Sequence, residues 1–287
     1  MAKKSMGQNF LKSKEALLKM CEASGLNDKD TVVEIGPGKG ALTEKLLEKA
    51  SQVIAVEKDR DLMTILEEKF ESEIKKGKLI LLNEDILNFK FPPPLTKGRA
   101  GEGFLINDLP SVPSLVRRGG INTYKIVANI PYNITGLIIR KFLSENPKPI
   151  SMTLLVQKEV AERIVARDGK ESILSLSVKA YGTPKYIMKV HKRFFSPTPK
   201  VDSAVIHIGD ISNKFFKNKN EEDSFFQLIK VGFAHKRKML RKNLEEIEKN
   251  LTKIDEIFEK LDINPKARAE DIKFEKWIEI SNLSIKN

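Results

Sequence analysis

The sequence of 287 residues is poor in cysteine, histidine and long apolar runs, and each shortage excludes a class of protein. Cys21 is the single cysteine, which excludes an intrachain disulfide framework and a cysteine-rich metal site. Three histidines make a poor basis for a structural zinc site, so we expect no bound metal. No apolar run approaches the ~20 residues that span a bilayer, and the basic N-terminus lacks the apolar stretch of a secretory signal. We therefore expect a cytoplasmic protein without a membrane segment.

Positive charge, in contrast, is abundant. The chain has 51 Lys and Arg against 39 Asp and Glu, which gives a formal net charge of +12. A protein this basic commonly binds a polyanion, most often a nucleic acid, although the charge could serve solubility alone.

The first two thirds of the chain alternate short aliphatic runs with helical patterns. The predicted strands are 31–35, 53–56, 79–82, 124–128 and 152–156, and helical spacing follows at 42–49, from Asp61 onward and at 136–143. Buried runs that alternate with helices predict an α/β fold, a mostly parallel sheet with helices on both faces.

Two other regions depart from this alternation. Ten of the 32 residues in 91–122 are Pro or Gly, where average usage gives about four, so we interpret this segment as a long irregular insertion. Its position before the fourth strand puts it away from the strand ends where ligands bind.

After about residue 215 the pattern is helical, with stretches at 225–233, 239–251, 254–261 and 274–283. We therefore predict two domains, 1–211 with the insertion and 212–287 as a small helical domain.

Glycines and carboxylates follow the first three predicted strands. The first strand ends in the turn Gly36-Pro37-Gly38, where glycines let the backbone approach a ligand closely. Glu57 ends the second strand, where a carboxylate can accept hydrogen bonds from both hydroxyls of a ribose. Asp85, after the third strand, can either accept from an adenine amino group or cap a helix. The set predicts a site for NAD or S-adenosylmethionine (SAM), although a Pro inside the glycine turn disfavours the pyrophosphate of NAD.

The run NIPYN, which begins at Asn129, follows the fourth predicted strand and is expected in the same cleft. The side-chain carbonyl of Asn129 and the backbone carbonyl of Ile130 can accept both protons of an exocyclic amine, which aims the nitrogen lone pair at an electrophile. Pro131 stiffens the turn, and Tyr132 offers a flat face for a base. The pattern favours methyl transfer to a base amine, a reaction dominated by positioning.

In order along the chain, these motifs and four others resemble the KsgA family of small-subunit ribosomal RNA adenine dimethyltransferases. The resemblance covers nearly the whole chain apart from 91–122. Its motifs are SMGQNFL, EIGPGKG, VEKD, NED, NIPYN, FSPTPKVDSAV, FAHKRKMLRKNL and INPKARAEDI.

The resemblance implies a Rossmann-like SAM-dependent methyltransferase domain, a small helical C-terminal domain that binds RNA, and no metal. It implies dimethylation at N6 of two adjacent adenosines near the 3′ end of small-subunit rRNA, within the immature subunit. We expect the chain to act as a monomer.

Individual residues take roles from the same resemblance. Asn9 and Leu11 should close over SAM, Gly36 and Gly38 should pass beneath its methionine part, and Asn129 should bind at the reacting centre. Glu57 should bind the ribose, and Asp85 with Ile86 the adenine.

Phe195 should stack on the flipped target base opposite Tyr132, and Lys200 should contact a phosphate. Asp202 and Ser203 are expected to be structural.

RNA contacts are also expected from a dense cationic cluster, whose members include Lys236, Arg237, Lys238 and Arg241. Three alternatives stay open at this point. One is an Erm-type methyltransferase of large-subunit rRNA, which shares the SAM motifs and NIPYN. Another is a non-catalytic RNA-binding or DNA-binding factor, and the third is an NAD-dependent oxidoreductase.

Overall fold

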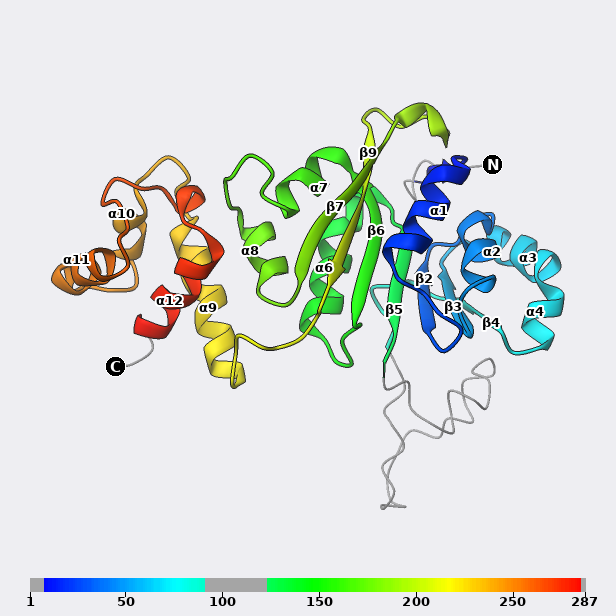
Figure 1. Cartoon of the computed structure of the whole chain (residues 1–287), viewed down its shortest axis with the longest axis horizontal. Coiled ribbons are helices and arrows are strands. Elements are labelled where there is room, and N and C mark those ends of the chain that lie inside the picture. Colours follow the sequence, from blue (N-terminus) through cyan, green and yellow to red (C-terminus); the bar gives the residue numbers. More distant parts are fainter. Residues whose placement is uncertain (1–7, 91–122, 285–287) are drawn as a thin grey trace, which may run out of the picture. The chain divides into compact units, whose positions relative to one another are not determined.

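A seven-stranded sheet carries the N-terminal part of the chain (Figure 1). The computed structural model describes residues 8–90 and 123–284, so the predicted insertion at 91–122 lies outside the described residues. The strand order is β4-β3-β2-β5-β6-β9-β7, and the first five of these run parallel. They are β4 (Leu79–Asn83), β3 (Gln52–Glu57), β2 (Thr31–Ile35), β5 (Lys125–Asn129) and β6 (Ser151–Gln157).

The parallel strands agree with the five predicted ones, because each contains an aliphatic run, and β2, β3 and β6 are buried along almost their whole length. Two strands of this seven-stranded sheet were not predicted. β9 (Ser203–Gly209) pairs antiparallel with β6, and β7 (Thr183–Val190) lies at the sheet edge beyond it. β7 alternates exposed and half-buried residues, including two lysines, so it lacks the continuous apolar run of the central strands.

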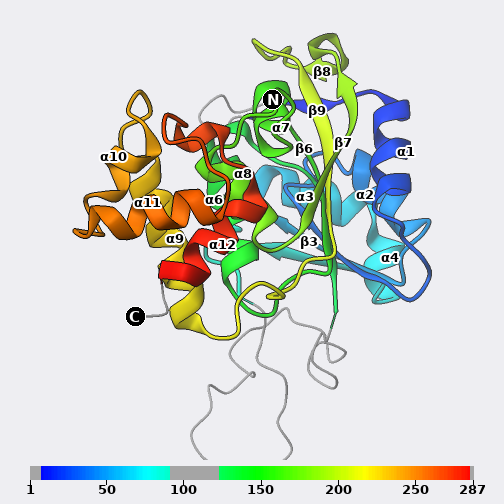
Figure 2. The ribbon, with the colours of Figure 1, turned by 60° about the vertical axis from the view of Figure 1, so that its left-hand side comes forward.

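Helices flank the sheet, as Figure 2 shows. Ser13 caps α1, because its Oγ accepts from the Ala16 N–H, and Asp59 caps α3 in the same way through the Asp61 N–H. One core cluster joins α1 and α2 to alternate residues of the sheet. The helices of this part are α1 (Lys14–Ala23), α2 (Ala41–Leu47), α3 (Arg60–Lys69), α4 (Glu71–Lys75), α6 (Thr135–Ser144) and the 3-10 turns η3 (Tyr132–Ile134) and η4 (Lys192–Phe194). The predicted α/β fold is therefore confirmed.

A second, two-stranded sheet fastens the N-terminal segment. β1 (Phe10–Leu11) pairs antiparallel with β8 (Phe195–Ser196), and the Lys12 N–H donates to the Phe194 carbonyl at 2.7 Å. Residues almost 190 positions apart in the sequence are thereby adjacent.

The chain divides into two compact units, Met1–Lys158 with Lys185–Ile211, and Glu159–Pro184 with Ser212–Asn287. This grouping differs from the predicted division at 211/212, because residues 159–184 join the C-terminal segment. Tyr181 donates to the buried Glu222 carboxylate and stacks on Phe226, and the Glu171 N–H donates to the Glu270 carbonyl at 2.8 Å.

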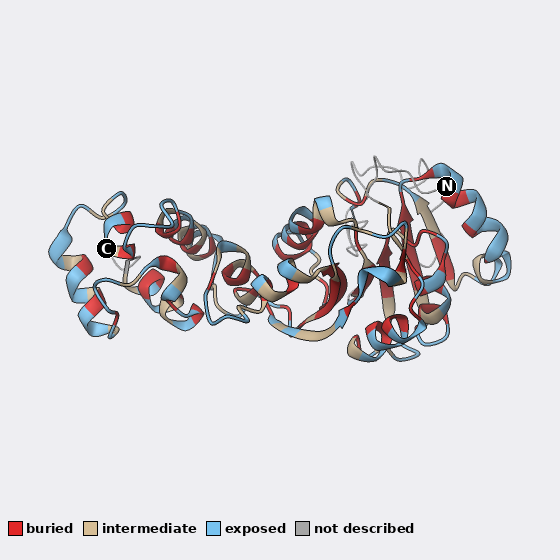
Figure 3. Cartoon of the chain, turned by 90° about the horizontal axis from the view of Figure 1, so that it is seen from above, coloured by how far each residue is buried: buried red, intermediate tan, exposed pale blue. Residues whose placement is uncertain are grey.

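The second unit is helical, with a core of large side chains that includes Trp277, Phe225 and Phe258. Figure 3 shows the buried inner faces and exposed outer faces of its helices. The predicted helix at 239–251 is shorter in the structure: it ends at Leu244, and Asn250 caps a separate helix by accepting from the Lys253 N–H. The helices are α7 (Lys158–Ile164), α8 (Ile173–Lys179), α9 (Lys219–Gly232), α10 (Leu240–Leu244), α11 (Leu251–Lys260), η5 (Ala269–Asp271) and α12 (Phe274–Ser284).

Gly40 gives a test of the packing beneath the glycine turn. It has φ +75°, and a Cβ there would overlap the Phe70 ring, which is 5% exposed. We expect Gly40→Ala to lower the free energy of unfolding by about 2–4 kcal/mol, from left-handed strain plus overpacking. Denaturant unfolding measures it. Gly77→Ala, also at positive φ but with open space around its Cβ, separates the strain from the overlap and should cost less.

Candidate active site

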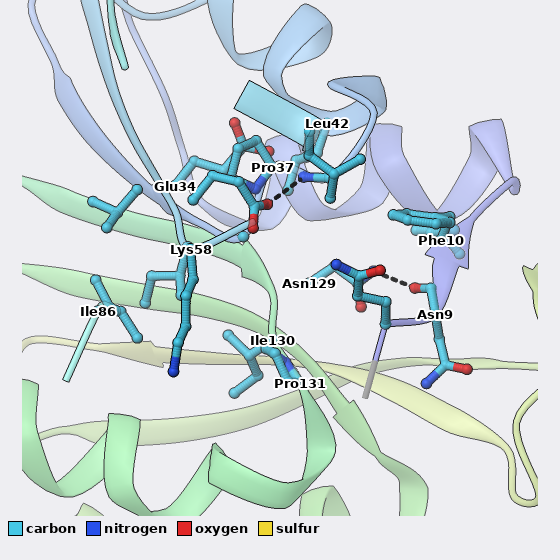
Figure 4. Close-up of a pocket in the computed structure, with 18 of the residues that line it drawn as sticks. Asn9, Phe10, Glu34, Pro37, Leu42, Lys58, Ile86, Asn129, Ile130 and Pro131 are labelled. Atoms are coloured by element: carbon cyan, nitrogen blue, oxygen red, sulfur yellow. Dashed lines mark hydrogen bonds between the residues drawn. The ribbon is translucent and has the colours of Figure 1, made fainter. Parts of the chain in front are cut away.

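A cavity of about 650 Å³ lies at the carboxyl ends of β2, β3, β4 and β5. Parallel strands all end at this edge, so the residues that follow them converge there. Figure 4 shows side chains from four of these strand ends and from the N-terminal segment around one space. The predicted site residues among its lining are Asn9, Leu11, Gly36, Gly38, Glu57, Asp85, Ile86, Asn129, Ile130, Pro131 and Tyr132.

The glycine turn forms one wall of this cavity. Gly36 has φ +64°, and no atom lies within 4 Å of where its Cβ would be, so the turn leaves open space beside the backbone. Gly38 has φ +60°, and its own Cβ position lies 3.0 Å from the Phe10 ring, so this glycine is in close contact with the N-terminal segment.

The Glu57 carboxylate joins two turns. Its Oε2 accepts from the Gly38 N–H at 3.2 Å, and its Oε1 accepts from the Asp59 N–H at 2.9 Å. The residue is 6% exposed, and this burial raises the pKa of Glu57 while the two N–H donors oppose the rise. The carboxylate is fixed at the tip of β3, where its remaining lone pairs can meet a ligand.

Asp85 lies across the cavity, after the end of β4. It pairs with Lys58, a residue for which the sequence predicted no role. Lys58 Nζ donates to Asp85 Oδ2 at 2.8 Å, and the Leu87 N–H donates to Oδ1 at 3.0 Å. The Lys58 ammonium, followed by the Leu87 N–H, lowers the pKa of Asp85. Asp85 is thus held as a carboxylate acceptor, and Lys58 adds a cation to the same wall.

Asn129, the last residue of β5, has a defined amide orientation. Its Nδ2 donates to the backbone carbonyl of Asn9 at 3.0 Å, as the dashed line in Figure 4 marks. Because the N–H end of the amide is committed to the N-terminal segment, Oδ1 is the end that can accept a hydrogen bond from a bound amine.

Tyr132 lines the cavity next to Asn129, and its hydroxyl meets Ser203 Oγ at 2.5 Å. Burial raises the pKa of Tyr132, so the hydroxyl is a neutral phenol near neutral pH. Ser203, which the sequence predicts to be structural, is therefore a direct neighbour of this ring.

Residues 1–286 of this sequence match the model of one protein family, whose description is "Ribosomal RNA adenine dimethylase". The chain belongs to this family. Ribosomal RNA small subunit methyltransferase A from Fusobacterium nucleatum subsp. nucleatum is 38% identical over 280 residues, 97% of this chain and 96% of that protein. The protein of the same name from Dehalococcoides mccartyi is 40% identical over 281 residues, 96% of this chain and 86% of that one.

Solved structures agree with the fold. A dimethyladenosine transferase from Plasmodium falciparum superposes with a TM-score of 0.72 at 25% identity, covering 96% of this chain and 98% of its own. The 23S rRNA methyltransferase ErmE has a TM-score of 0.74 at 22% identity, with the same two coverages. At that identity the likeness to ErmE concerns the fold alone. The predicted family and its Rossmann-like methyltransferase fold are confirmed, and membership in a methyltransferase family implies SAM as the methyl donor.

Phe195 is one family residue that the structure does not bring to the cavity. Its ring is 2% exposed and belongs to the core cluster with Leu11, its partner across β1 and β8. The adjacent Ser196 lines the cavity instead. Stacking of Phe195 on a target base stays a prediction, and the observed packing does not support it, because the ring face is covered by core side chains.

Glu34 is a buried carboxyl of the cavity lining that no sequence motif singled out. It is 1% exposed on β2 and lies beside Thr43 of α2. Burial raises the pKa of Glu34 to about 8; hydrogen bonding from Thr43 opposes this rise, and the nearby Glu57 carboxylate adds to it. A motif reading focused on glycines gives no signal for this, because the burial depends on the packed fold.

The predicted RNA-contacting cations divide into two groups. Lys200 in the first unit, and Lys236, Arg237 and Lys238 between α9 and α10 of the second, are exposed and form none of the ion pairs of the described residues. Arg241 is different, because its guanidinium donates to Asp255 at 2.6 and 2.8 Å and to Glu245 at 3.1 Å. Its role as a phosphate ligand is therefore not supported, since its donors already bind carboxylates.

Residues 8–90 and 123–284 contain no group of three or more His, Cys, Asp and Glu side chains that could hold a metal ion. Over the same residues, no helix is both long and apolar enough to cross a membrane.

Glu34 gives a pH-dependent prediction. Its ordinary pKa of 4.5 applies to the unfolded chain, whereas the folded chain keeps the proton up to about pH 8. Between these values the folded state binds the extra proton, so its stability falls as pH rises, by about 1.4 kcal/mol per pH unit for this one group. Glu34→Gln should remove this contribution. Urea unfolding across the window compares the two proteins, and Glu67→Gln on the exposed face of α3 makes the same chemical change as a control. Equal slopes in wild type and Glu34→Gln would contradict the assignment.

Proposed function

We propose that this protein transfers two methyl groups from SAM to N6 of each of two adjacent adenosines near the 3′ end of small-subunit rRNA. It would do so during assembly of the small ribosomal subunit. The two relatives described above carry the name of a small-subunit methyltransferase and match over 96% and 86% of their own lengths, which supports this choice of RNA.

One observation carries the chemical part of the proposal. The Asn129 amide donates to the Asn9 carbonyl, so Oδ1 of Asn129 and the backbone carbonyl of Ile130 are left as acceptors at the cavity. A target amine that donates both protons to these oxygens has its lone pair directed away from them. Positioning of this kind dominates methyl transfer, and no strong general base is required.

The cavity residues fit SAM. The open space beside Gly36 admits a ligand that a Cβ would block, and Glu57 and Asp85 are acceptors at the tips of neighbouring strands. We infer that Glu57 binds the ribose, that Asp85 and Ile86 bind the adenine, and that Asn9 and Leu11 cover the cofactor. Bound there, SAM would supply its sulfonium methyl group to N6, with the methyl–sulfur bond exchanged for a methyl–nitrogen bond and one N6 proton released to water.

The target base has to leave its stack to reach this cavity. We infer that the Tyr132 ring stacks on it and that Pro131 fixes the turn carrying this ring. Lys200, Lys236, Arg237 and Lys238 are inferred to bind RNA phosphates, the last three from the small helical domain. We further propose that the chain acts as a monomer in the cytoplasm, which light scattering and cell fractionation can test.

The decisive experiment supplies the protein with labelled SAM and unmethylated small ribosomal subunits, and in parallel with unmethylated large subunits. The RNA is digested to nucleosides and analysed by mass spectrometry. We expect N6,N6-dimethyladenosine from the small subunits alone. Product from large subunits alone would favour the Erm-type reaction, and SAM binding without product from either would favour a non-catalytic RNA-binding factor.

Asn129→Asp tests the reacting centre within the same assay. The change is nearly isosteric but removes the N–H that meets Asn9, and it sets a carboxylate against that carbonyl. We expect methyl transfer to fall at least ~100-fold, in the range of losing a positioned polar group, while affinity for the subunit is kept. Unchanged transfer would refute the role of Asn129.

The cationic loop, which we define as residues 236–238 between α9 and α10, gives a separate prediction. Replacing Lys236, Arg237 and Lys238 by Gln should reduce the slope of log affinity against log salt by about 2 to 3. Arg241→Gln removes one positive charge as well, but that charge is paired with Asp255, so we expect little change in the slope and a less stable second unit. Fluorescence anisotropy with a small-subunit rRNA fragment measures the slopes. The loop variant removes three charges and Arg241→Gln one, so an equal reduction of the slope per charge removed would show that net charge, not this loop, sets RNA affinity.

A further inference from the structure

The Tyr132 ring is fixed at both of its ends. At the backbone end, it opens the η3 turn directly after Pro131, and the Ile134 N–H donates to the Pro131 carbonyl at 3.3 Å. At the far end, its hydroxyl meets Ser203 Oγ at 2.5 Å. A ring held at the Cα and at the hydroxyl keeps one plane relative to the cavity that it lines.

Ser203 is well suited to hold the far end. It is the first residue of β9, has no exposed surface, and pairs with Gln157 of β6 in the antiparallel ladder. Among the described residues, Tyr132 is the hydrogen-bond partner recorded for this hydroxyl.

The neighbouring Asp202 anchors the start of the same strand. Its carboxylate accepts from Lys189 Nζ at 2.9 Å and from the Lys192 N–H at 3.0 Å, and its carbonyl accepts from the Lys158 N–H at 3.0 Å. The backbone on which Ser203 sits is therefore fixed by contacts independent of Tyr132.

We propose that Ser203 is a positioning residue for methyl transfer, acting by holding the plane of the Tyr132 ring against the target base. This inference rests on the proposed function and deepens it. Ser203 touches neither the base nor the cofactor in this scheme, and its effect passes through Tyr132 alone.

The second methyl transfer depends on this ring more than the first does. Unmodified adenine has two N6 protons to give to the Asn129 and Ile130 oxygens, whereas N6-methyladenine has one. With one of these hydrogen bonds gone, stacking supplies a larger share of the alignment. Loosening the ring should therefore slow the second transfer more than the first, and the intermediate should accumulate.

The test uses the full chain with unmethylated small subunits, and compares wild type with Ser203→Ala, Tyr132→Phe and the double variant. Each single change removes one hydroxyl of the pair. We expect each to lower the rate of dimethylation by about three- to tenfold, as loss of one hydrogen bond would, and the double variant to lose no more than either. At equal total methyl incorporated, each should yield at least a twofold higher ratio of N6-methyladenosine to N6,N6-dimethyladenosine.

Tyr124→Phe is a matched control. Tyr124 directly precedes β5, as Tyr132 follows it, and its hydroxyl donates to the Pro147 carbonyl at 2.8 Å. The same atom is removed at the opposite end of the same strand, so the product ratio should stay at the wild-type value.

The product ratio separates positioning from stability, since a loss of folded enzyme lowers both products without changing their ratio at equal incorporation. A lower melting temperature with a wild-type ratio in both single variants would overturn the proposal, as would losses that multiply in the double variant. Tyr132→Phe leaves Ser203 in β9 untouched, so it still gives an answer if Ser203→Ala folds poorly. If wild type makes no dimethyladenosine, the proposed function itself fails, and that outcome is distinct from a wild-type ratio in the variants.

Discussion

The hydrogen bonds of the Glu57 carboxylate are the constraint on which the rest of the site depends. One carboxylate oxygen binds the turn after β2 through the Gly38 N–H, and the other binds the turn after β3 through the Asp59 N–H. Asp59 in turn accepts from Gln8 Nε2 at 2.9 Å, so the same chain of contacts reaches the N-terminal segment. Three segments that are separate in the sequence are thereby held around one cavity.

The N-terminal segment completes that cavity by contacts of different kinds. The Asn9 carbonyl accepts a hydrogen bond from Asn129 Nδ2. The Phe10 ring lies against Gly38, and Leu11 pairs with Phe195. No interaction in this set is large alone, but all of them require the same path for residues 8–12. A segment too short to form a core of its own is held by partners from the strand ends of the main sheet and from β8.

The sequence predicted the features that have a local pattern, which are the aliphatic strands and the residues that mark strand ends. The five parallel strands each contain an aliphatic run, and the glycine turn, Glu57, Asp85 and NIPYN mark strand ends, so their meeting at one sheet edge follows from parallel topology. Strand β7 was not predicted, because it lies at a sheet edge and its exposed positions include two lysines. Long-range side-chain pairs were not predicted for another reason, because the local sequence of a residue does not indicate a distant partner. The pairs are Lys58 with Asp85, Ser203 with Tyr132, and Arg241 with Asp255. The burial of Phe195 likewise depends on a strand pair formed with a distant segment.

The fixed amide of Asn129 has a consequence for the choice of base. A free asparagine can rotate its amide and present either a donor or an acceptor, so it tolerates both amino and carbonyl groups on a ring. Here rotation would set Oδ1 against the Asn9 carbonyl, leaving two acceptors facing each other at the distance now spanned by a hydrogen bond. In the proposed reaction, the site therefore meets an incoming base with an acceptor. A purine with a carbonyl at position 6, such as guanine or hypoxanthine, would encounter electrostatic repulsion where adenine donates, so discrimination among purines is built into the fold of the N-terminal segment.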